Sequence, residues 1–171
     1  NNIKKSDFSG NSFNESVLLP LLLETNSSTT LFSLYLAKSI FFYFFRNTEK
    51  CLESAVQGQE YLKYVVGQIT VSYHNLYYSL SLLSEYPNQS ISEQEASLKT
   101  VLANQKQMQF WANHAPQNYQ HKYDLVAAEI ARVLGNNWQA MELYDQAIAG
   151  AKENKYIQEE AIANELAAQF Y

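Results

Sequence analysis

The stretch LGNNWQAMELYDQAIAGA, residues 134–151, decides the fold class of this chain. Gly135 suits the left-handed position that ends a helix, and Asn136 can cap the helix that follows. Three side chains then recur at helical spacing on one face of that helix: Ala140, Tyr144 and Ala147. Small residues at this spacing let a second helix approach closely, and the bulky ring fills the space beside them. The stretch therefore predicts a packed helical hairpin.

Composition excludes several classes of protein. Of the 171 residues, 47% are hydrophobic and 17% are charged, which fits one folded domain with a sizeable core. Five glycines and three prolines are too few for an all-β protein with many tight turns. The net charge of -5, with no Lys/Arg cluster, argues against nucleic acid or an anionic membrane as a partner. The single cysteine rules out an internal disulfide, and a reducing cytoplasm is the simplest setting.

The most apolar run, LFSLYLAKSIFFYFF over residues 31–45, predicts a buried helix rather than a membrane span. It includes Lys38 and falls short of the roughly 20 apolar residues that a spanning helix needs. A helix that is apolar on nearly every side can be the central helix of a soluble domain. We find no signal peptide in the sequence.

Capping and breaking signals divide the chain into a flexible leader, residues 1–11, and one helical domain, residues 12–171. Capping boxes are expected at Ser12 and Ser92, and Gly67 is expected to end a helix. The helices are expected at about 12–23, 30–46, 49–66, 70–86, 92–115, 120–134, 136–152 and from 157 onward. The run at residues 61–73 has enough β-branched and aromatic residues to leave a strand open there. We expect a segment of a longer protein, truncated at its C-terminal end, because the chain lacks an initial Met and ends within an apolar pattern.

Small residues recur at long intervals along the expected helices. Ser39, Ser79, Ala128 and Ala168 are separated by 40, 49 and 40 positions. A repeated interval in an all-helical chain is typical of an α-solenoid, because one hairpin cannot bury its apolar face alone and stacks on the next. The predicted fold is all-α: a right-handed α-solenoid of antiparallel helical hairpins with about seven to eight helices.

The hairpin of the opening stretch resembles a tetratricopeptide repeat. Its turn glycine, two alanines and tyrosine match the second half of that motif, and Ala128 matches the small residue of the first helix. Asp124 stands where the motif has a bulky aromatic residue, and Lys152 where it often has proline. An earlier hairpin resembles the motif less well, with Arg46 in place of the turn glycine. Three small or apolar residues follow there: Cys51, Ala55 and Gly58.

Longer phrases resemble the helical region of large bacterial multidomain signalling kinases. They include LPLLLETNSSTTLFSLYLAKS, YYSLSLLSEYP, NQKQMQFWANHAPQNYQHKYDLVAAEIARVLGNNWQAMELYDQAI and ENKYIQEEAIANELAAQFY. In that family a Ser/Thr-kinase-like domain and a predicted ATPase precede the region, and GAF sensor and histidine kinase domains follow it. The resemblance implies a tetratricopeptide-like segment between nucleotide-binding and sensory domains of a two-component signal-transduction protein. None of that family's catalytic motifs lies in it.

The sequence offers little catalytic or metal-binding chemistry. We predict no catalytic residue, no cofactor and no metal, because a Gly-rich phosphate loop and kinase motifs are absent. The three histidines, His74, His114 and His121, are expected to be structural or exposed. Cys51 is expected to be a buried and inert thiol. The acidic cluster at the start of the last helix, which includes Glu159, is expected to be solvated and to favour the helix dipole.

The predicted function is a non-catalytic scaffold that binds protein, either other domains of the same chain or a signalling partner, and couples sensor to kinase domains. By the resemblance, first helices line the binding face of such repeats. That face would include Tyr43, Lys122, Leu125, Glu129 and Arg132. The alternative is a small-molecule sensor with an aromatic-lined cavity between helices. The sequence names neither the partner nor the oligomeric state.

Overall fold

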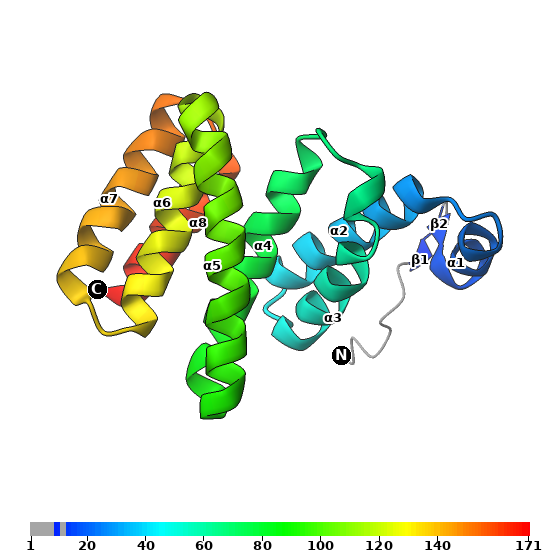
Figure 1. Ribbon diagram of the computed structural model, residues 1–171, viewed down its shortest axis with the longest axis horizontal. Helices are drawn as coiled ribbons and strands as arrows, with labels where there is room; N and C mark the ends of the chain where they lie inside the picture. The colour runs from blue at the N-terminus through cyan, green and yellow to red at the C-terminus, as the bar shows by residue number, and fades with distance from the viewer. Residues whose placement is uncertain (1–8, 11–12) are drawn as a thin grey trace. The chain divides into compact units, whose positions relative to one another are not determined.

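The computed structural model describes residues 9–10 and 13–171, and the chain divides into two compact units, residues 1–81 and 82–171. The described part contains eight α-helices, which confirms the predicted all-α class and helix count (Figure 1). Two compact units stand where the sequence suggested one domain. The predicted flexible leader lies outside the described residues except for Ser9 and Gly10.

Helix α2 is the central helix of unit 1. Its elements are β1 Ser9–Gly10, β2 Phe13–Asn14, α1 Glu15–Glu24, α2 Ser28–Phe44, α3 Thr48–Gln59, the short 3₁₀ helix η1 Leu62–Tyr64 and most of α4, Thr70–Glu85. The two short strands pair antiparallel, with Gly10 opposite Phe13. Helix α2 packs against α1, α3 and η1. Ser12, where a capping box was expected, lies outside the described residues.

The apolar helix α2 is buried as predicted, and its one charged residue is paired. Phe32 and Leu36 of α2 form a core cluster with Val65, which follows η1. Lys38 donates to the buried carboxylate of Glu15 at the start of α1. An ion pair of this kind lets a lysine lie on an otherwise apolar helix. Among the described residues, no helix combines the length and apolarity needed to cross a membrane.

Unit 2 is organised around helix α6. Its elements after the end of α4 are the 3₁₀ helix η2 Tyr86–Asn88, α5 Ile91–His114, α6 Pro116–Val133, α7 Asn137–Glu153 and α8 Ile157–Phe170. Helix α6 contacts α5, α7 and α8, and α7 also contacts α8. Pro116 lies at the first position of α6, where its missing N–H costs nothing.

The structure differs from the sequence prediction at several places, including the start of α6, which lies at Pro116 rather than near residue 120. Helix α3 ends at Gln59 because the chain then folds back and buries Val65 against α2. Gly67 therefore lies in a connection, with φ of +83°. The capping box of α5 lies two residues earlier than expected: the Glu93 carboxylate accepts hydrogen bonds from the N–H and hydroxyl groups of Ser90, at 2.8 and 2.6 Å. No strand forms between residues 61 and 73, which are all described.

The same turn ends four of the helices. At each one, a residue in the left-handed conformation follows the helix, and the N-cap residue of the next helix comes directly after it. The left-handed residues are Asn26, Arg46, Gly135 and Lys155, with φ of 50°, 56°, 76° and 63°. In the turn after α6, Gly135 N–H donates to Arg132 O and Asn136 N–H to Ala131 O, at 3.1 and 2.8 Å. These paired bonds satisfy the last carbonyls of the helix, as in a Schellman motif.

Because only one of the four turns has glycine at the left-handed position, the others are strained. We expect Lys155→Gly to stabilise unit 2 by about 0.5–1 kcal/mol. This is the free energy gained by relieving the left-handed strain, minus the free energy lost because glycine increases the entropy of the unfolded chain. The measurement is the urea midpoint followed by circular dichroism. The matched control is Gly135→Ala, which introduces the same strain and should destabilise by a similar amount. Equal midpoints for both variants and the parent would contradict this reading of the turns.

The inner stripe of the opening stretch is buried as predicted. Ala140, Tyr144 and Ala147 are fully buried on α7. In the earlier hairpin the corresponding small residues, Cys51, Ala55 and Gly58, are also buried. The predicted interval fails at its last position, because Ala168 is exposed and its neighbour Ala167 is buried. Asn136 is the N-cap of α7, but its side chain makes no capping hydrogen bond.

Candidate functional site

The predicted binding face on α6 is for the most part an internal surface. Lys122, Leu125 and Glu129 are buried, so the prediction that they line an open face is wrong. The physical reason is that polar groups of α7 and α8 contact this face directly. Arg132 keeps 28% of its side chain exposed. Tyr43 is half-buried on α2 and belongs to unit 1, whereas the other four residues belong to unit 2.

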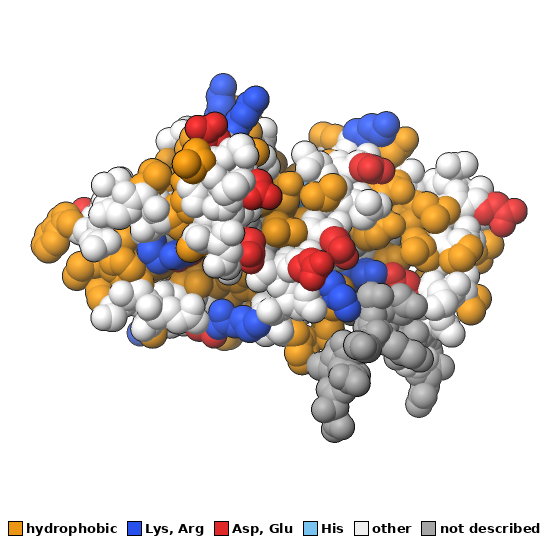
Figure 2. All heavy atoms as spheres, turned by 90° about the horizontal axis from the view of Figure 1, so that it is seen from below, with side chains coloured by type: hydrophobic (Ala, Val, Ile, Leu, Met, Phe, Trp, Pro, Cys, Tyr) orange, Lys and Arg blue, Asp and Glu red, His pale blue; other side chains and the backbone are white. Residues whose placement is uncertain are grey.

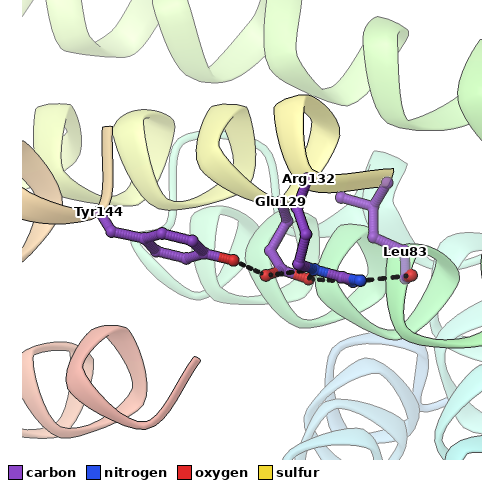
Figure 3. Close-up of polar contacts among 4 residues, drawn as sticks. All are labelled: Leu83, Glu129, Arg132 and Tyr144. Carbon is purple, nitrogen blue, oxygen red and sulfur yellow. Dashed lines mark hydrogen bonds and ion pairs between the residues drawn. The ribbon is translucent and has the colours of Figure 1, made fainter. Parts of the chain in front are cut away.

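Glu129 is the centre of the first polar cluster (Figure 3). Its carboxylate accepts from Arg132 Nε at 3.1 Å, from Arg132 Nη2 at 2.7 Å and from the hydroxyl of Tyr144 on α7. Arg132 Nη2 also donates to Leu83 O at 3.4 Å, in the last turn of α4. Three charge-assisted hydrogen bonds satisfy a carboxylate that is only 2% exposed. The cluster thus joins α6 to α7 and to the C-terminal end of α4.

Lys122 is the centre of the second cluster, at the other end of the same face. The ammonium is fully buried and donates to Asn118 O and to His121 Nε2, each at 3.0 Å. Glu159 Oε1 of α8 lies 3.1 Å from Lys122 Nζ. The ring of Tyr156, the N-cap residue of α8, covers the ammonium with its centroid 4.1 Å from Nζ. Two hydrogen-bond acceptors and one carboxylate counter-charge therefore surround the buried ammonium.

Glu159 corrects the prediction that the acidic residues near the start of α8 are solvated. Glu159 is 4% exposed and faces a buried cation. Glu153 remains exposed, and Glu160 is half-buried. The sequence carried no local signal for this difference, since Lys122 lies 37 positions earlier in the chain.

Burial moves the pKa values of several groups in unit 2. It lowers the pKa of Lys122, which the Glu159 carboxylate opposes, and it lowers the pKa of His121 to about 3, with the nearby Lys122 charge adding to the effect. Burial raises the pKa of Tyr144, and the adjacent Glu129 charge raises it further. Burial also raises the pKa of Asp124, although a hydrogen bond from Gln120 opposes this. Each shift follows from packing and pairing inside the helical unit, and such networks also occur where no reaction takes place.

In unit 1, Cys51 is a buried thiol, as predicted. It is fully buried and donates to Ser39 O at 3.1 Å, and its sulfur lies 2.9 Å from Ser81 Oγ. Burial raises the pKa of Cys51 to about 11, and the contact with Ser81 opposes the shift. His74 is also buried, its Nε2 lies 2.8 Å from Ala55 O, and burial lowers its pKa.

Because Cys51 is the single cysteine of the chain, its reactivity reports on unit 1 alone. We expect native protein at pH 7.5 to react with a disulfide reagent at least about 100-fold more slowly than urea-unfolded protein, since the thiolate is the nucleophile and the group is inaccessible. The absorbance of the released thiol measures the rate. Reaction of native protein at the unfolded rate would show that Cys51 is accessible.

The described residues hold no arrangement suited to a metal. Within residues 9–10 and 13–171, no group of three or more His, Cys, Asp or Glu side chains could hold an ion. The three histidines do not form a common site. His74 and His121 are buried in different units, and His114 is exposed on α5.

Comparison with known proteins adds no relative. No protein-family model, no curated protein and no solved structure matches this chain. The resemblance to tetratricopeptide repeats and to the helical region of signalling kinases therefore stays a prediction from the quoted sequence.

Proposed function

We propose that the chain is a non-catalytic helical scaffold that binds protein, built as a right-handed α-solenoid of tetratricopeptide-like hairpins. The recurring turn and the buried small residues of α3 and α7 support this arrangement. In the α2–α3 hairpin Cys51 donates to Ser39 O, and in the α6–α7 hairpin Gly150 lies against His121. Repeats of this kind use their outer side chains for recognition.

The observation that carries the proposal is where large apolar side chains remain exposed. Each of the four recurring turns is flanked by at least one such side chain. They are Leu23, Phe44, Phe45, Leu134, Trp138 and Ile157. Trp138 and Ile157 are each 77% exposed, at the starts of α7 and α8. On the face drawn in Figure 2, hydrophobic side chains are exposed among uncharged polar groups and scattered charged side chains. Exposed aromatic residues beside rigid turns are suited to contact a partner.

The surface proposed to contact a partner therefore lies at the turns, and not on the inner face of α6 as the sequence predicted. Of the residues predicted from the sequence, Arg132 and Tyr43 retain partial exposure and remain candidates. The partner is protein, in line with the net charge of -5, which disfavours nucleic acid and anionic membranes. We further propose, from sequence resemblance alone, that the chain is the cytoplasmic segment between nucleotide-binding and sensor domains of a bacterial signalling kinase.

Photo-crosslinking in the full-length protein tests this function. A benzophenone amino acid replaces Trp138, Phe45 or Ile157, and mass spectrometry identifies what is captured. We expect reproducible crosslinks to defined peptides of another domain or of one partner protein. The matched controls carry the crosslinker at Gln139 and Glu49, which are exposed polar positions beside the same turns.

Crosslinking at the turns that does not exceed the control positions would reject the interaction proposal. The sensor alternative predicts a different result, a melting temperature that rises with the concentration of a small molecule. A thermal-shift screen on the same protein separates the two functions.

A further inference from the structure

The contact between α6 and α8 contains two adjacent bases and one carboxylate. Lys122 Nζ donates to His121 Nε2, so this nitrogen must be the unprotonated one and the ring proton lies on Nδ1. His121 Nδ1 is buried and has no hydrogen-bond partner among the described residues. The ring of Tyr156 lies against the His121 ring, with centroids 4.4 Å apart. His121 is thus held neutral, between a cation and the N-cap residue of α8.

We propose that α8 is an acid-released helix: a proton bound by His121 undocks α8 from α6. Protonation would turn the acceptor Nε2 into a donor that faces an ammonium 3.0 Å away. Two positive charges would then share the single carboxylate of Glu159, inside a site that excludes water. Undocking α8 removes Tyr156 and Glu159 from the site and lets water solvate both cations. This regulation goes beyond the proposed scaffold function and does not depend on it.

The charge that acts on His121 is that of Lys122. From α7, Gly150 faces it, and a side chain at that position would lie 3.3 Å from His121 Cβ. From α5, the uncharged Gln105 donates to Tyr123 O and the ring of Trp111 lies near that of Tyr119. On α6 itself, Asp124 is bonded to Gln120. The charge of Lys122, and that of Glu159 with which it is paired, therefore act on a protonated His121.

The direction of the pH dependence follows from proton linkage. The docked state holds the pKa of His121 at about 3, and the undocked state returns it to near its ordinary value of 6.5. The undocked state therefore binds more protons between these two values, and acid favours it. Docking is strongest above pH 6.5 and weakens by up to about tenfold for each pH unit below it. Between pH 7.5 and 5, carboxylates with ordinary pKa values stay ionised.

Methyl NMR of isoleucine-labelled protein tests the release. Ile162 is buried on α8, and Ile148 on α7 reports on the rest of unit 2. Relaxation dispersion of the Ile162 methyl group should reveal a minor undocked state whose population rises about tenfold or more from pH 6.5 to pH 5. Ile148 should show no such rise. A constant Ile162 population, or an equal rise at Ile148, would reject local release of α8.

Substitutions of His121 and Lys122 test whether His121 is the group that binds the proton. In His121→Gln the rise should disappear, because the amide does not titrate. In Lys122→Met the rise should become smaller but persist, because burial, the larger cause of the lowered His121 pKa, remains. The control His114→Gln removes an exposed histidine of α5 and should keep the full rise. Persistence of the rise in His121→Gln, or in His121→Asn if the first variant does not fold, would overturn the proposal. Protonation of His74 affects unit 1 and is followed separately at Ile40.

Discussion

Glu129→Ala is expected to destabilise unit 2 by about 3–5 kcal/mol, among the largest effects of a single substitution in this chain. The carboxylate accepts three hydrogen bonds, two from Arg132 and one from Tyr144. Without it, the buried hydroxyl of Tyr144 has no acceptor and the partly buried guanidinium has no counter-charge. Urea unfolding followed by circular dichroism measures the loss.

Two further variants decide what the cluster contributes. Tyr144→Phe should cost about 1–3 kcal/mol, because it removes one hydrogen bond and leaves the ion pair in place. The triple variant Glu129→Met, Arg132→Met and Tyr144→Phe should be close to neutral, since it removes both charges and the Tyr144 hydroxyl that would otherwise lose its acceptor. The matched control is Glu142→Ala on the exposed side of α7, expected within about 0.5 kcal/mol of the parent. A Glu129→Ala effect as small as that control would mean that the cluster is solvated.

The second large effect is expected for Glu159→Gln, at about 3–5 kcal/mol, because it leaves the fully buried Lys122 without a counter-ion. Urea unfolding at pH 7.5 measures this loss. Glu160→Gln is the matched control: it makes the same chemical change on the neighbouring, less buried residue and should have an effect within about 0.5 kcal/mol. Equal effects of the two variants would show that α8 does not depend on this ion pair.

The fold was predictable where the signal is local. The glycine at position 135 and the small residues at 140 and 147 lie within one hairpin, and their spacing alone indicates how it packs. The buried state of α2 also followed from its apolar run and single lysine. Arg46 and Lys155 gave no such signal, because a charged residue in the left-handed conformation is uncommon.

The site was not predictable, for a different reason. Charged residues on a helix are expected at the surface, so Lys122, Glu129 and Glu159 were assigned there. Their burial depends on partners that lie 15 to 37 positions away in sequence and meet only after the helices pack. A sequence gives the spacing of residues along one helix, but it does not say which polar residues of two helices will meet.

The recurring turn has a consequence for how such a chain can change in length. Its left-handed residues lie 20 positions apart in each unit, at 26 and 46 and again at 135 and 155. A segment of that length contains one complete helix and one recurring turn. Its duplication or deletion would therefore leave the residues of both flanking turns unchanged. Because two helices joined by such a turn run in opposite directions, duplication in steps of two such segments, a whole hairpin, keeps the direction of the helices that follow. The same turns mark where a designer could insert another hairpin with the least disturbance to its neighbours.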